Sequence, residues 1–567
     1  MNTIMNMNSR AVLGWVLALS VTLTGCGREE PAKPAENTAK AETTVAAPAK
    51  ELKKHPVTGD FLAPKQVLVR GNGAEPGSID PQLVEGSVGG HIVRDLFEGL
   101  TSSGPNGEVV PGMATSWESK EGNRQWVFHL RNNAKWTDGT PVTAHDFVYA
   151  WQRAVDPALA SNYAYFLEIA SIVNATEIIN GKMPPSELGV KAVDDYTFEV
   201  NLSAPIPYLA IMTSHYTMFP APRQAIEKHG NNWTKPGNII SNGAYQLVEW
   251  NVGEKMTAKR NTNYWDNEHT IIDEVVYLPI EDETAELQRY EAGELNFTNG
   301  APVSQMDRLK RERADELKIS PMLGTYMYQF NMKKPLFSDV RIRKALTLAI
   351  DRDIIVNHIT KAGQIPAYNL TPFYIAGFEA PKPDFASWTQ TQRDAEAVKL
   401  LAEAGYTKEN PLQFELLYNT NEAHKAIAVA MSQMWKEKLG VQVSPVNMEW
   451  KTYLSEKKAG NFEVARYGWI GDYNEASTFL SLITTNSGNN DGRWSNAEYD
   501  KLLDEARFES DPNSKYVQAE AIVAAEFPVI PIYFYTNVAL VSKNTVGYAV
   551  NNPQNNLYSK DMYIKAD

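Results

Sequence analysis

One short segment carries charges of both signs at a spacing that could hold the two ends of an extended ligand. Arg466 precedes Asp472 by six residues, which is roughly 20 Å in a fully extended chain. The apolar and aromatic residues between them alternate as in a strand, and Gly468 would allow a ligand backbone to approach closely. Taken alone, each of the two charges is interpreted more simply as a member of an ordinary structural ion pair.

Sequence motifs of catalysis and of cofactor or metal binding are absent. The sequence has no H-E-x-x-H, no G-x-S-x-G and no Walker lysine loop. Gly71-Asn72-Gly73 begins like a dinucleotide-binding fingerprint, but Pro76 stands where the third glycine belongs, so a turn is predicted. None of the nine histidines has a partner at the i, i+4 spacing. We therefore expect no cofactor, no metal and no enzyme activity.

The elements that position these residues alternate between strand and helix patterns. Residues 126–131 alternate as a strand, and Thr143 or Asp146 is placed to cap a helix whose apolar face continues to Ala154. Ser338 precedes another apolar helix, and residues 426–435 form a further apolar stripe that Gly440 would end. There is no internal repeat, so the pattern predicts mixed α/β domains.

Composition excludes several classes of protein. The chain has 567 residues, enough for several domains, and 54 Lys+Arg against 68 Asp+Glu, for a net charge of −14. This charge argues against nucleic-acid binding. Aromatic residues are frequent, with 13 Trp and 26 Tyr, which leaves carbohydrate stacking open without favouring it. The single cysteine excludes an intramolecular disulfide, a cysteine zinc site and an iron–sulfur cluster.

The amino terminus explains that cysteine. Arg10 precedes an apolar stretch of the length found in secretory signals, too short to span a membrane. The stretch ends in Leu23-Thr24-Gly25-Cys26, similar to a bacterial lipobox. We expect residues 1–25 to be a signal peptide and Cys26 to carry the lipid, with a plain signal peptide as the alternative. Residues 26–63 would then be the lipidated cysteine and a flexible tether rich in alanine and proline.

Residues along most of the chain resemble one known family. Its motifs include Arg94-Asp95-Leu96-Phe97-Glu98-Gly99-Leu100, Trp136-Thr137-Asp138-Gly139-Thr140-Pro141, Asn242-Gly243-Ala244-Tyr245 and Asp339-Val340-Arg341-Ile342-Arg343-Lys344-Ala345-Leu346. From about residue 65 to the end, the chain resembles the extracytoplasmic oligopeptide-binding proteins of ABC importers, solute-binding protein family 5.

The resemblance implies an α/β, two-lobed periplasmic-binding-protein fold with an additional third domain and hinge crossovers. Lobe I would comprise residues 64–97, 222–323 and 537–567. The extra domain would comprise residues 98–221, and lobe II residues 324–536. Ligand would be trapped when the two lobes close.

The same resemblance assigns the ligand-binding residues. Asp472 matches the residue that binds the peptide ammonium, and Arg466 one that binds the carboxylate of a shorter peptide. His424 matches the position that meets the carboxylate of a longer peptide; on its own it would be a first-turn helix histidine. The further matching positions are Glu85, Ser87, Gly468, Ile470 and Lys457. The aromatic walls of the side-chain pockets match Tyr163, Trp450, Trp469 and Tyr535, for which core packing is the simpler interpretation.

Two positions depart from the family pattern. A cysteine pair of the enteric relatives falls on Gly324 and Ile470, so this chain lacks that crosslink. A lysine that serves shorter ligands in relatives is replaced by Thr360, with Lys361 beside it, which puts dipeptide binding in doubt.

These observations predict a lipid-anchored protein in the periplasmic space that captures short peptides and delivers them to an inner-membrane ABC permease. It would act as a monomer, bind no nucleic acid, and contact the membrane through its lipid. The same fold with a narrower ligand is the alternative: murein tripeptide, haem, glutathione or a nickel chelate. An envelope peptide hydrolase and a structural or adhesive lipoprotein are alternatives from other classes.

Overall fold

The computed structural model describes residues 52–373, 375, 377–509 and 511–566. The predicted signal peptide, Cys26 and most of the predicted tether lie outside the described residues.

A mixed four-stranded sheet combines residues from two distant parts of the chain. Its strand order is β1-β10-β9-β8, with β1 and β10 parallel and the other neighbours antiparallel. Valine and leucine recur in β1 and β10, where half-buried and buried residues alternate along the first four positions of each strand. The strands are β1 (Val67–Gly71), β8 (Tyr245–Asn251), β9 (Lys255–Arg260) and β10 (Glu274–Leu278).

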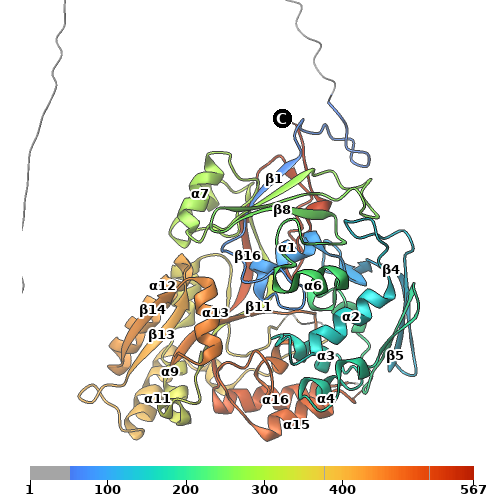
Figure 1. The fold of residues 1–567 in the computed structure, drawn as a ribbon. Helices are drawn as coiled ribbons and strands as arrows, with labels where there is room; N and C mark the ends of the chain where they lie inside the picture. The colour runs from blue at the N-terminus through green and yellow to red at the C-terminus, as the bar shows by residue number, and fades with distance from the viewer. Residues whose placement is uncertain (1–51, 374, 376, 510, 567) are drawn as a thin grey trace, which may run out of the picture. The chain divides into compact units, whose positions relative to one another are not determined.

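An antiparallel sheet is built entirely from residues 114–201. Its order is β4-β5-β7-β6, and α2 packs against it through Phe147 and Trp151, whose rings contact Phe198. The strands are β4 (Ala114–Lys120), β5 (Gln125–Leu130), β6 (Val190–Asp194) and β7 (Thr197–Asn201). Figure 1 shows β4 and β5 at one flank of the ribbon.

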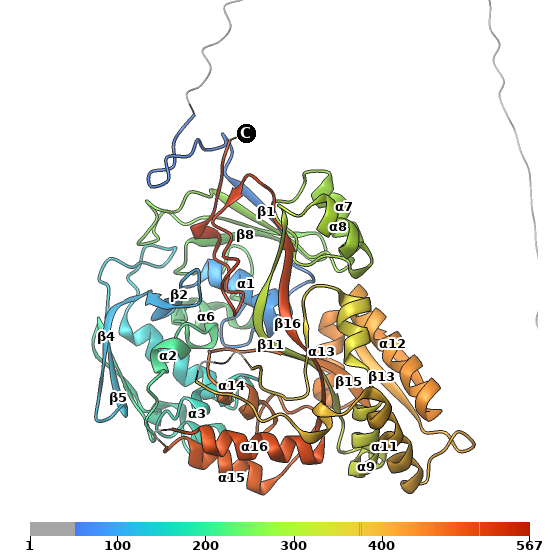
Figure 2. The same ribbon diagram turned by 180° about the vertical axis from the view of Figure 1, so that it is seen from behind.

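A six-stranded sheet carries the segment that contains Arg466. Its order is β12-β16-β11-β15-β13-β14; β13 is parallel to β14 and to β15, because α12 and α13 provide the crossover connections. Helices α9, α11 and α12 bury their apolar residues against this sheet (Figure 2). The strands are β11 (Leu317–Phe330), β12 (Ile365–Pro366), β13 (Gln413–Asn419), β14 (Gln442–Met448), β15 (Val464–Ile470) and β16 (Val529–Leu540).

The remaining elements are helices and two small two-stranded pairings. The pairings are β2 (Thr101–Ser103) with β3 (Val109–Pro111), and β17 (Thr545–Val546) with β18 (Tyr563–Ile564). The helices are α1 (Gly86–Leu96), α2 (Ala144–Val155), α3 (Ala164–Ile169), α4 (Ala175–Ile179), α5 (Leu209–Met212), α6 (Arg223–His229), α7 (Glu283–Glu291), α8 (Met306–Glu312), α9 (Val340–Leu348), α10 (Arg352–Ile354), α11 (Gln390–Glu403), α12 (Glu422–Leu439), α13 (Trp450–Ala459), α14 (Ser477–Leu480), α15 (Ala497–Ala506) and α16 (Asn513–Glu526).

The local sequence predictions are largely confirmed. The strand predicted at residues 126–131 is β5, and Thr143 precedes α2 while the Asp146 carboxylate accepts a 2.7 Å hydrogen bond from the Thr143 N–H. Gly440 ends α12 in the left-handed region, with φ of 75°. The prediction around Ser338 was one residue off: Asp339 caps α9 by accepting from the Arg341 N–H.

Two strands pass through the predicted boundaries of lobe II. β11 crosses the boundary at residues 323 and 324, and β16 crosses the one at 536 and 537. Their pairing register shifts between Pro321 and Thr325, so a β-bulge lies at the crossing. The division into lobes itself stays a prediction.

The end of the predicted tether differs from the flexible spacer expected. Residues 52–63 form a turn that pairs with the carboxyl-terminal segment: the Ala63 N–H donates to the Ile564 carbonyl at 2.9 Å, and Leu62 pairs with Lys565. The His55 ring stacks on Tyr563 with centroids 4.2 Å apart. Polar and aromatic contacts with the end of the chain therefore order residues whose composition alone predicts no core.

Candidate functional site

Two adjoining cavities open between the segments that carry the predicted ligand residues. The first cavity has a volume of about 130 Å³ and the second of about 330 Å³. The start of α1, Trp450 and alternate residues of β15 border both, so the two cavities are continuous. Together they are called the cleft.

Every predicted ligand residue lines the cleft. The first cavity is lined by Glu85, Ser87, Tyr163, Trp450, Lys457, Gly468, Trp469, Ile470 and Asp472. The second cavity adds His424, Arg466 and Tyr535. The structure therefore brings these residues together from distant segments, while their roles in binding stay predictions.

Strand β15 carries the centre of the cleft. Side chains alternate between the two faces of a strand, and here Ala465, Tyr467 and Trp469 are buried. Arg466 and Ile470 on the other face are only half-buried, with Gly468 between them, and all three line the second cavity. Asp472 follows the end of the strand. The predicted alternation therefore aims Arg466 into the second cavity and leaves Asp472 at the first.

Asp472 is held by a histidine that sequence reasoning missed. The Asp472 carboxylate is 92% buried, and its Oδ1 lies 3.2 Å from His215 Nε2. His215 Nδ1 accepts from the Thr217 N–H, so Nε2 is the ring nitrogen that donates to Asp472. Asp472 Oδ2 is buried and has no hydrogen-bond partner in the described residues. Because burial of an unpartnered carboxylate oxygen is costly, Asp472 is prepared to accept a hydrogen bond from a cation.

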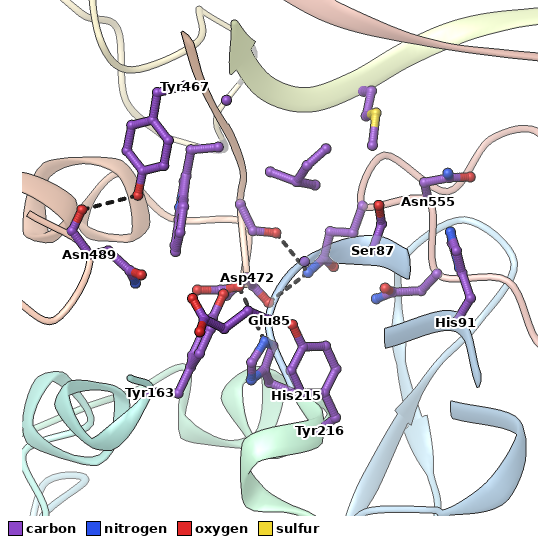
Figure 3. Close-up of a pocket in the computed structure, with 18 of the residues that line it drawn as sticks. Glu85, Ser87, His91, Tyr163, His215, Tyr216, Tyr467, Asp472, Asn489 and Asn555 are labelled. Atoms are coloured by element: carbon purple, nitrogen blue, oxygen red, sulfur yellow. Dashed lines mark hydrogen bonds and ion pairs between the residues drawn. The ribbon is translucent and has the colours of Figure 1, made fainter. Parts of the chain in front are cut away.

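Aromatic rings surround this carboxylate. Tyr163 stacks against His215 with centroids 5.1 Å apart and lies parallel to Trp469 at 6.3 Å. Figure 3 shows Tyr163, His215 and Tyr216 gathered around Asp472 and Glu85. Rings with negative faces favour a cation among them. The first cavity is therefore suited to an ammonium group.

Arg466 lies among tyrosines in the second cavity. Its Nη2 donates to the Tyr535 hydroxyl, and its guanidinium lies 4.8 Å from the centre of the Tyr326 ring. Its Nε is buried without a hydrogen-bond partner, and within the described residues it forms no ion pair with a carboxylate. For Arg466, the ordinary structural ion pair considered from the sequence is therefore not formed, and the guanidinium can receive an anionic group.

His424 is neutral in this arrangement. It lies in the first turn of α12, as expected, and its Nδ1 is 3.3 Å from the Tyr326 hydroxyl. Burial and the nearby Arg466 guanidinium lower the pKa of His424 well below its usual range. It can therefore serve a carboxylate as a hydrogen-bond donor, and as a cation only if the ligand restores its charge.

Lys457 forms a buried ion pair that the sequence did not indicate. Its Nζ lies 3.1 Å from Asp491, which also lies 3.3 Å from Lys458, and both Lys457 and Asp491 are over 90% buried. The ammonium lies 4.0 Å from the centre of the Tyr467 ring. Burial lowers the pKa of Lys457. This lysine therefore has a protein counter-ion before any ligand arrives.

The beginning of α1 brings Glu85 and Ser87 to the cleft. Glu85 precedes the helix, and its carboxylate accepts from the Asn162 amide. Gly86 has φ of +73°, and a Cβ placed there would lie 3.2 Å from the Trp450 ring. Trp450 therefore closes tightly over this turn, and a larger residue at position 86 would displace it.

Comparison with known proteins assigns the chain to a family. The model of the bacterial extracellular solute-binding proteins, family 5 (middle part), matches residues 108–491, more than half of the chain. The chain belongs to this family. The family is one of solute-binding proteins with a two-lobed α/β fold and an extra domain, as expected.

Curated relatives cover nearly the whole described chain. The periplasmic oligopeptide-binding protein OppA of Salmonella typhimurium is 46% identical over 510 residues, 89% of this chain and 94% of that protein. The periplasmic murein peptide-binding protein MppA of Escherichia coli is 45% identical, with 89% and 95% covered. A probable deoxycholate-binding periplasmic protein of E. coli, YgiS, is 43% identical, also with 89% and 95% covered.

Solved structures of family members superpose over the same extent. The E. coli murein tripeptide binding protein MppA gives a TM-score of 0.88 at 44% identity, covering 89% of this chain and all of that one. Haemophilus influenzae OppA in complex with the peptide RPPGFSPFR gives 0.87 at 43% identity, with the same coverage. The unliganded open form of MppA gives 0.64 at 44% identity over 90% of this chain and 99% of that one. The backbone is therefore less similar to the open form.

The positions that depart from the family pattern are neighbours of the cleft. Gly324 of β11 and Ile470 of β15 are direct cross-strand partners. Thr360 is buried and lines the second cavity, where its hydroxyl donates to the Gln364 amide oxygen at 2.9 Å. Lys361 instead pairs with Asp307 at 2.6 Å. The second cavity therefore receives no lysine from this turn.

Several cleft residues were missed by sequence reasoning. His215 lines the cleft and contacts Asp472, while His91, Asn489 and Asn555 line it with buried polar atoms that have no partner in the described residues. Asp491, which pairs with Lys457, was also missed, although it lies outside the lining itself. These residues belong to no motif. The histidine at 215, beside a tyrosine in a polar run, is the only one of them with a local signal, and nothing in the sequence links it to Asp472.

Two negative observations apply to the described part of the chain. No cluster of three or more histidine, cysteine, aspartate or glutamate side chains there is arranged to hold a metal ion. No helix there has both the length and the apolar character needed to cross a membrane.

Proposed function

We propose that this protein is an extracytoplasmic lipoprotein that captures short oligopeptides in the cleft and delivers them to an ABC importer of the inner membrane. Asp472 would bind the peptide ammonium. Arg466 would bind the carboxylate of a shorter peptide, and His424 that of a longer one. Gly468, which lies in β15 between Arg466 and Asp472 in the sequence, would let the ligand backbone form strand-like hydrogen bonds. Such hydrogen bonds do not depend on the identity of the ligand side chains.

One observation carries this proposal. The continuous cleft has a carboxylate with an unpartnered buried oxygen at one side and a guanidinium without a carboxylate partner at the other. A zwitterionic extended ligand would satisfy both groups at once, whereas either group left alone carries a desolvation penalty. The names of the relatives, which include oligopeptide- and murein-peptide-binding proteins, agree with such a ligand.

The proposed role of Asp472 is tested with the variant Asp472→Asn and a panel of tri- to pentapeptides. Loss of a charge-assisted hydrogen bond of about 1.5–3 kcal/mol should weaken peptides with a free amino terminus by about 10- to 100-fold. N-acetylated peptides should bind weakly to both proteins. Isothermal titration calorimetry measures both, and Asp315→Asn, whose side chain is 84% exposed, is the matched control.

Two results would contradict the proposal. If the natural chain binds no member of the panel, peptides are not its ligands. If Asp472→Asn weakens free and acetylated peptides equally, Asp472 does not bind the ammonium.

A narrower ligand is the second candidate. The observation in its favour is that oligopeptide-, murein-peptide- and deoxycholate-binding relatives are nearly equally similar, at 46%, 45% and 43% identity. Native mass spectrometry of protein purified without denaturation separates the candidates. Mixed peptides give a distribution of bound masses, whereas murein tripeptide, haem, glutathione or a nickel chelate gives one mass.

The anchor and the lobes complete the proposal. Lipid on Cys26 would hold the protein at the membrane, and the register shift of β11 and β16 supports a hinge between lobes divided as the sequence predicts. Cys26→Ala should release the protein from the membrane fraction. A chain that stays membrane-bound, or a mature protein whose mass shows no acyl groups, would exclude the lipid.

Peptide recovered uncleaved after incubation with the protein would separate this binding role from hydrolysis. Light scattering tests whether the protein is a monomer.

A further inference from the structure

A small hairpin, residues 52–65, begins the described chain, and we call it the terminal hairpin. Lys54 pairs antiparallel with Phe61, and the Leu62 N–H donates to the Lys53 carbonyl at 2.8 Å. Gly59, with φ of +76°, lies in the turn between the two arms. In Figure 1 the terminal hairpin is drawn in blue and projects from the folded body beside the carboxyl terminus.

The tip of the terminal hairpin is held in place. His55 Nδ1 accepts from the N–H groups of Val57 and Thr58 at 3.2 and 3.1 Å, and the His55 N–H donates to the Asp60 carbonyl at 2.8 Å. The His55 ring in turn stacks on Tyr563, which is 4% exposed. The folded body therefore fixes the hairpin, and the side chains at its tip are presented in one arrangement.

Three large apolar side chains of the terminal hairpin face solvent. Val57 is 81% exposed, Phe61 is 51% exposed, and Leu52 is exposed as well. Single exposed apolar residues are common on the surfaces of soluble proteins. Exposure alone therefore identifies no site here, and the charge of the hairpin and its place in the chain have to supply the argument.

The terminal hairpin is basic in an acidic protein. Lys53, Lys54 and Lys65 are exposed, and none of them forms an ion pair with a carboxylate of the described residues. Three lysines against one aspartate give the hairpin a positive net charge, whereas the whole chain carries −14. Lys54 Nζ lies 4.9 Å from the centre of the Phe61 ring, so cationic and apolar groups share one face. This combination is typical of surfaces that bind the interface of an anionic bilayer.

The acidic groups beside the hairpin already have partners. The Asp60 carboxylate accepts from the hydroxyl groups of Tyr563 and Thr58. Asp561, in the neighbouring carboxyl-terminal segment, pairs with Lys560 at 2.7 Å. The lysines of the hairpin are therefore available to an anion from outside the protein.

The terminal hairpin is also the described part of the chain that follows the proposed lipid site. Residues 27–51 separate Cys26 from the hairpin, and 25 residues reach at most about 90 Å. A lipid on Cys26 would keep the hairpin within that distance of the bilayer and raise its local concentration there. Anionic headgroups repel a protein of negative net charge, so a basic surface is the one that can approach them.

We propose that the terminal hairpin is the membrane-facing surface of this protein and contacts the anionic phospholipid headgroups of the bilayer that holds Cys26. The lysines would lie at phosphate groups, and Val57 and Phe61 would enter the boundary between headgroups and acyl chains. This inference rests on the lipid anchor of the proposed function and adds the surface that the anchored protein turns toward the membrane.

The test places one fluorescent probe on the lipidated protein in vesicles. Cys26 is the single cysteine and has no free thiol when acylated, so Val57→Cys provides one attachment point for a nitrobenzoxadiazole label. The label should emit more strongly, and at shorter wavelength, in vesicles that contain phosphatidylglycerol than in vesicles of phosphatidylcholine alone. Val398→Cys is the matched control: it is 49% exposed on α11, at the far end of the ribbon in Figures 1 and 2, and its label should not respond.

Charge variants test the role of the lysines. Each lysine near an anionic surface contributes about fivefold, so Lys53→Gln with Lys54→Gln should lower the equilibrium constant of contact by about 30-fold. Lys191→Gln with Lys408→Gln, two exposed lysines outside the hairpin, should leave it unchanged. Salt at about 1 M, where the Debye length is about 3 Å, should also abolish the response of the Val57 label.

Several results would overturn the inference while the anchor stands. In each of them the protein floats with the vesicles. The Val57 label then responds no more than the α11 label, or equally in both kinds of vesicle, or unchanged in the Lys53/Lys54 variant. A response in detergent without vesicles that grows with protein concentration would show that a second copy of the chain covers the hairpin instead.

Failure of the anchor is a separate result. If the natural chain does not float with vesicles, the lipid of the proposed function is wrong. The hairpin is then tested with Cys26 replaced by serine, by adding phosphatidylglycerol vesicles to the labelled protein. A response that rises with lipid concentration supports the membrane-facing hairpin, and no response at any lipid concentration overturns it.

Discussion

Each charged side chain in the cleft has a different kind of partner. Asp472 contacts the His215 ring, Arg466 contacts tyrosines, and Lys457 is paired with Asp491. Only the last is a complete ion pair. The Asp472 carboxylate and the Arg466 guanidinium can therefore contact a ligand directly. Lys457 must first release Asp491, or contact an anionic ligand together with it.

His424 should make the affinity for longer peptides depend on pH. Its pKa is lowered by burial and Arg466 in the ligand-free protein, and a peptide carboxylate beside it would raise that pKa, so binding takes up a proton. Affinity for peptides that reach His424 should therefore increase as the pH falls from about 8 to about 5. Calorimetry across this range checks the prediction.

The control for this pH effect is the variant His424→Gln, which should remove the difference between long and short peptides. An identical pH dependence for both lengths in the natural chain would show that His424 does not meet the carboxylate.

At the residue scale, the ligand-binding residues were predicted from the family resemblance, and the strand around Arg466 from the sequence pattern. The period of two places Arg466 and Gly468 on one face of β15, whereas Asp472 lies beyond the end of the strand. His215 contacts Asp472 although hundreds of residues separate them, and Asp491 reaches Lys457 from a loop. Their partners are chosen by tertiary packing, which leaves no periodic signal in the chain.

Among the elements, β15 depends on a glycine at its centre. A Cβ at Gly468 would lie 2.8 Å from Arg466 Nη2 and would also overlap the Tyr535 hydroxyl. Gly468→Ala should displace both groups, lower the free energy of unfolding by about 1–3 kcal/mol, and weaken peptide binding. Denaturant titration and calorimetry measure the two effects.

Gly77→Ala is the matched control for this substitution, since no atom lies within 4 Å of the Cβ position there. It should leave stability and binding nearly unchanged. Full affinity in Gly468→Ala would show that the ligand backbone does not pass close to this residue.

The β11–β15 pairing offers a second test. Gly324 and Ile470 are antiparallel partners, and such partners lie within the Cα separation that a disulfide requires. The double variant Gly324→Cys/Ile470→Cys, with Cys26 replaced by serine, should therefore form a disulfide on oxidation. Thiol titration and thermal melting with and without reductant should show loss of both thiols and a higher melting temperature.

Two free thiols after oxidation would indicate that the crowding at Gly324, whose Cβ would lie 2.9 Å from the Trp469 carbonyl oxygen, prevents closure of the bond.

Element prediction succeeded where a local signal was complete and failed where packing decided the outcome. The α2 helix has its cap, its apolar face and its first-turn aspartate within one segment. The docking of residues 52–63 on the carboxyl-terminal segment could not be predicted, because its hydrogen bonds join the two ends of the described chain. Likewise, no periodicity shows that β11 and β16 continue through a domain boundary.

At the scale of the whole molecule, ligand should stabilise the folded protein and make it more compact. The backbone is less similar to the unliganded open form of MppA than to the other MppA structure. Binding at about 100 times the Kd should add about 2.7 kcal/mol to the free energy of unfolding. Differential scanning calorimetry and small-angle X-ray scattering should show a higher melting temperature and a smaller radius of gyration.

The absence of both changes with every peptide tested would favour a structural or adhesive role over transport. A change with one peptide class alone would favour the narrower ligand.

The pairing of residues 61–63 with residues 564–566 has a practical consequence. The two ends of the described chain lie side by side (Figure 1), so a biotin or histidine tag at the carboxyl terminus attaches beside residues 61–63. Immobilised in this way on a biosensor chip, the protein would be held at the place where residues 61–63 pair with residues 564–566. Peptide capture on such a chip would then be measured on molecules that are all held in one orientation.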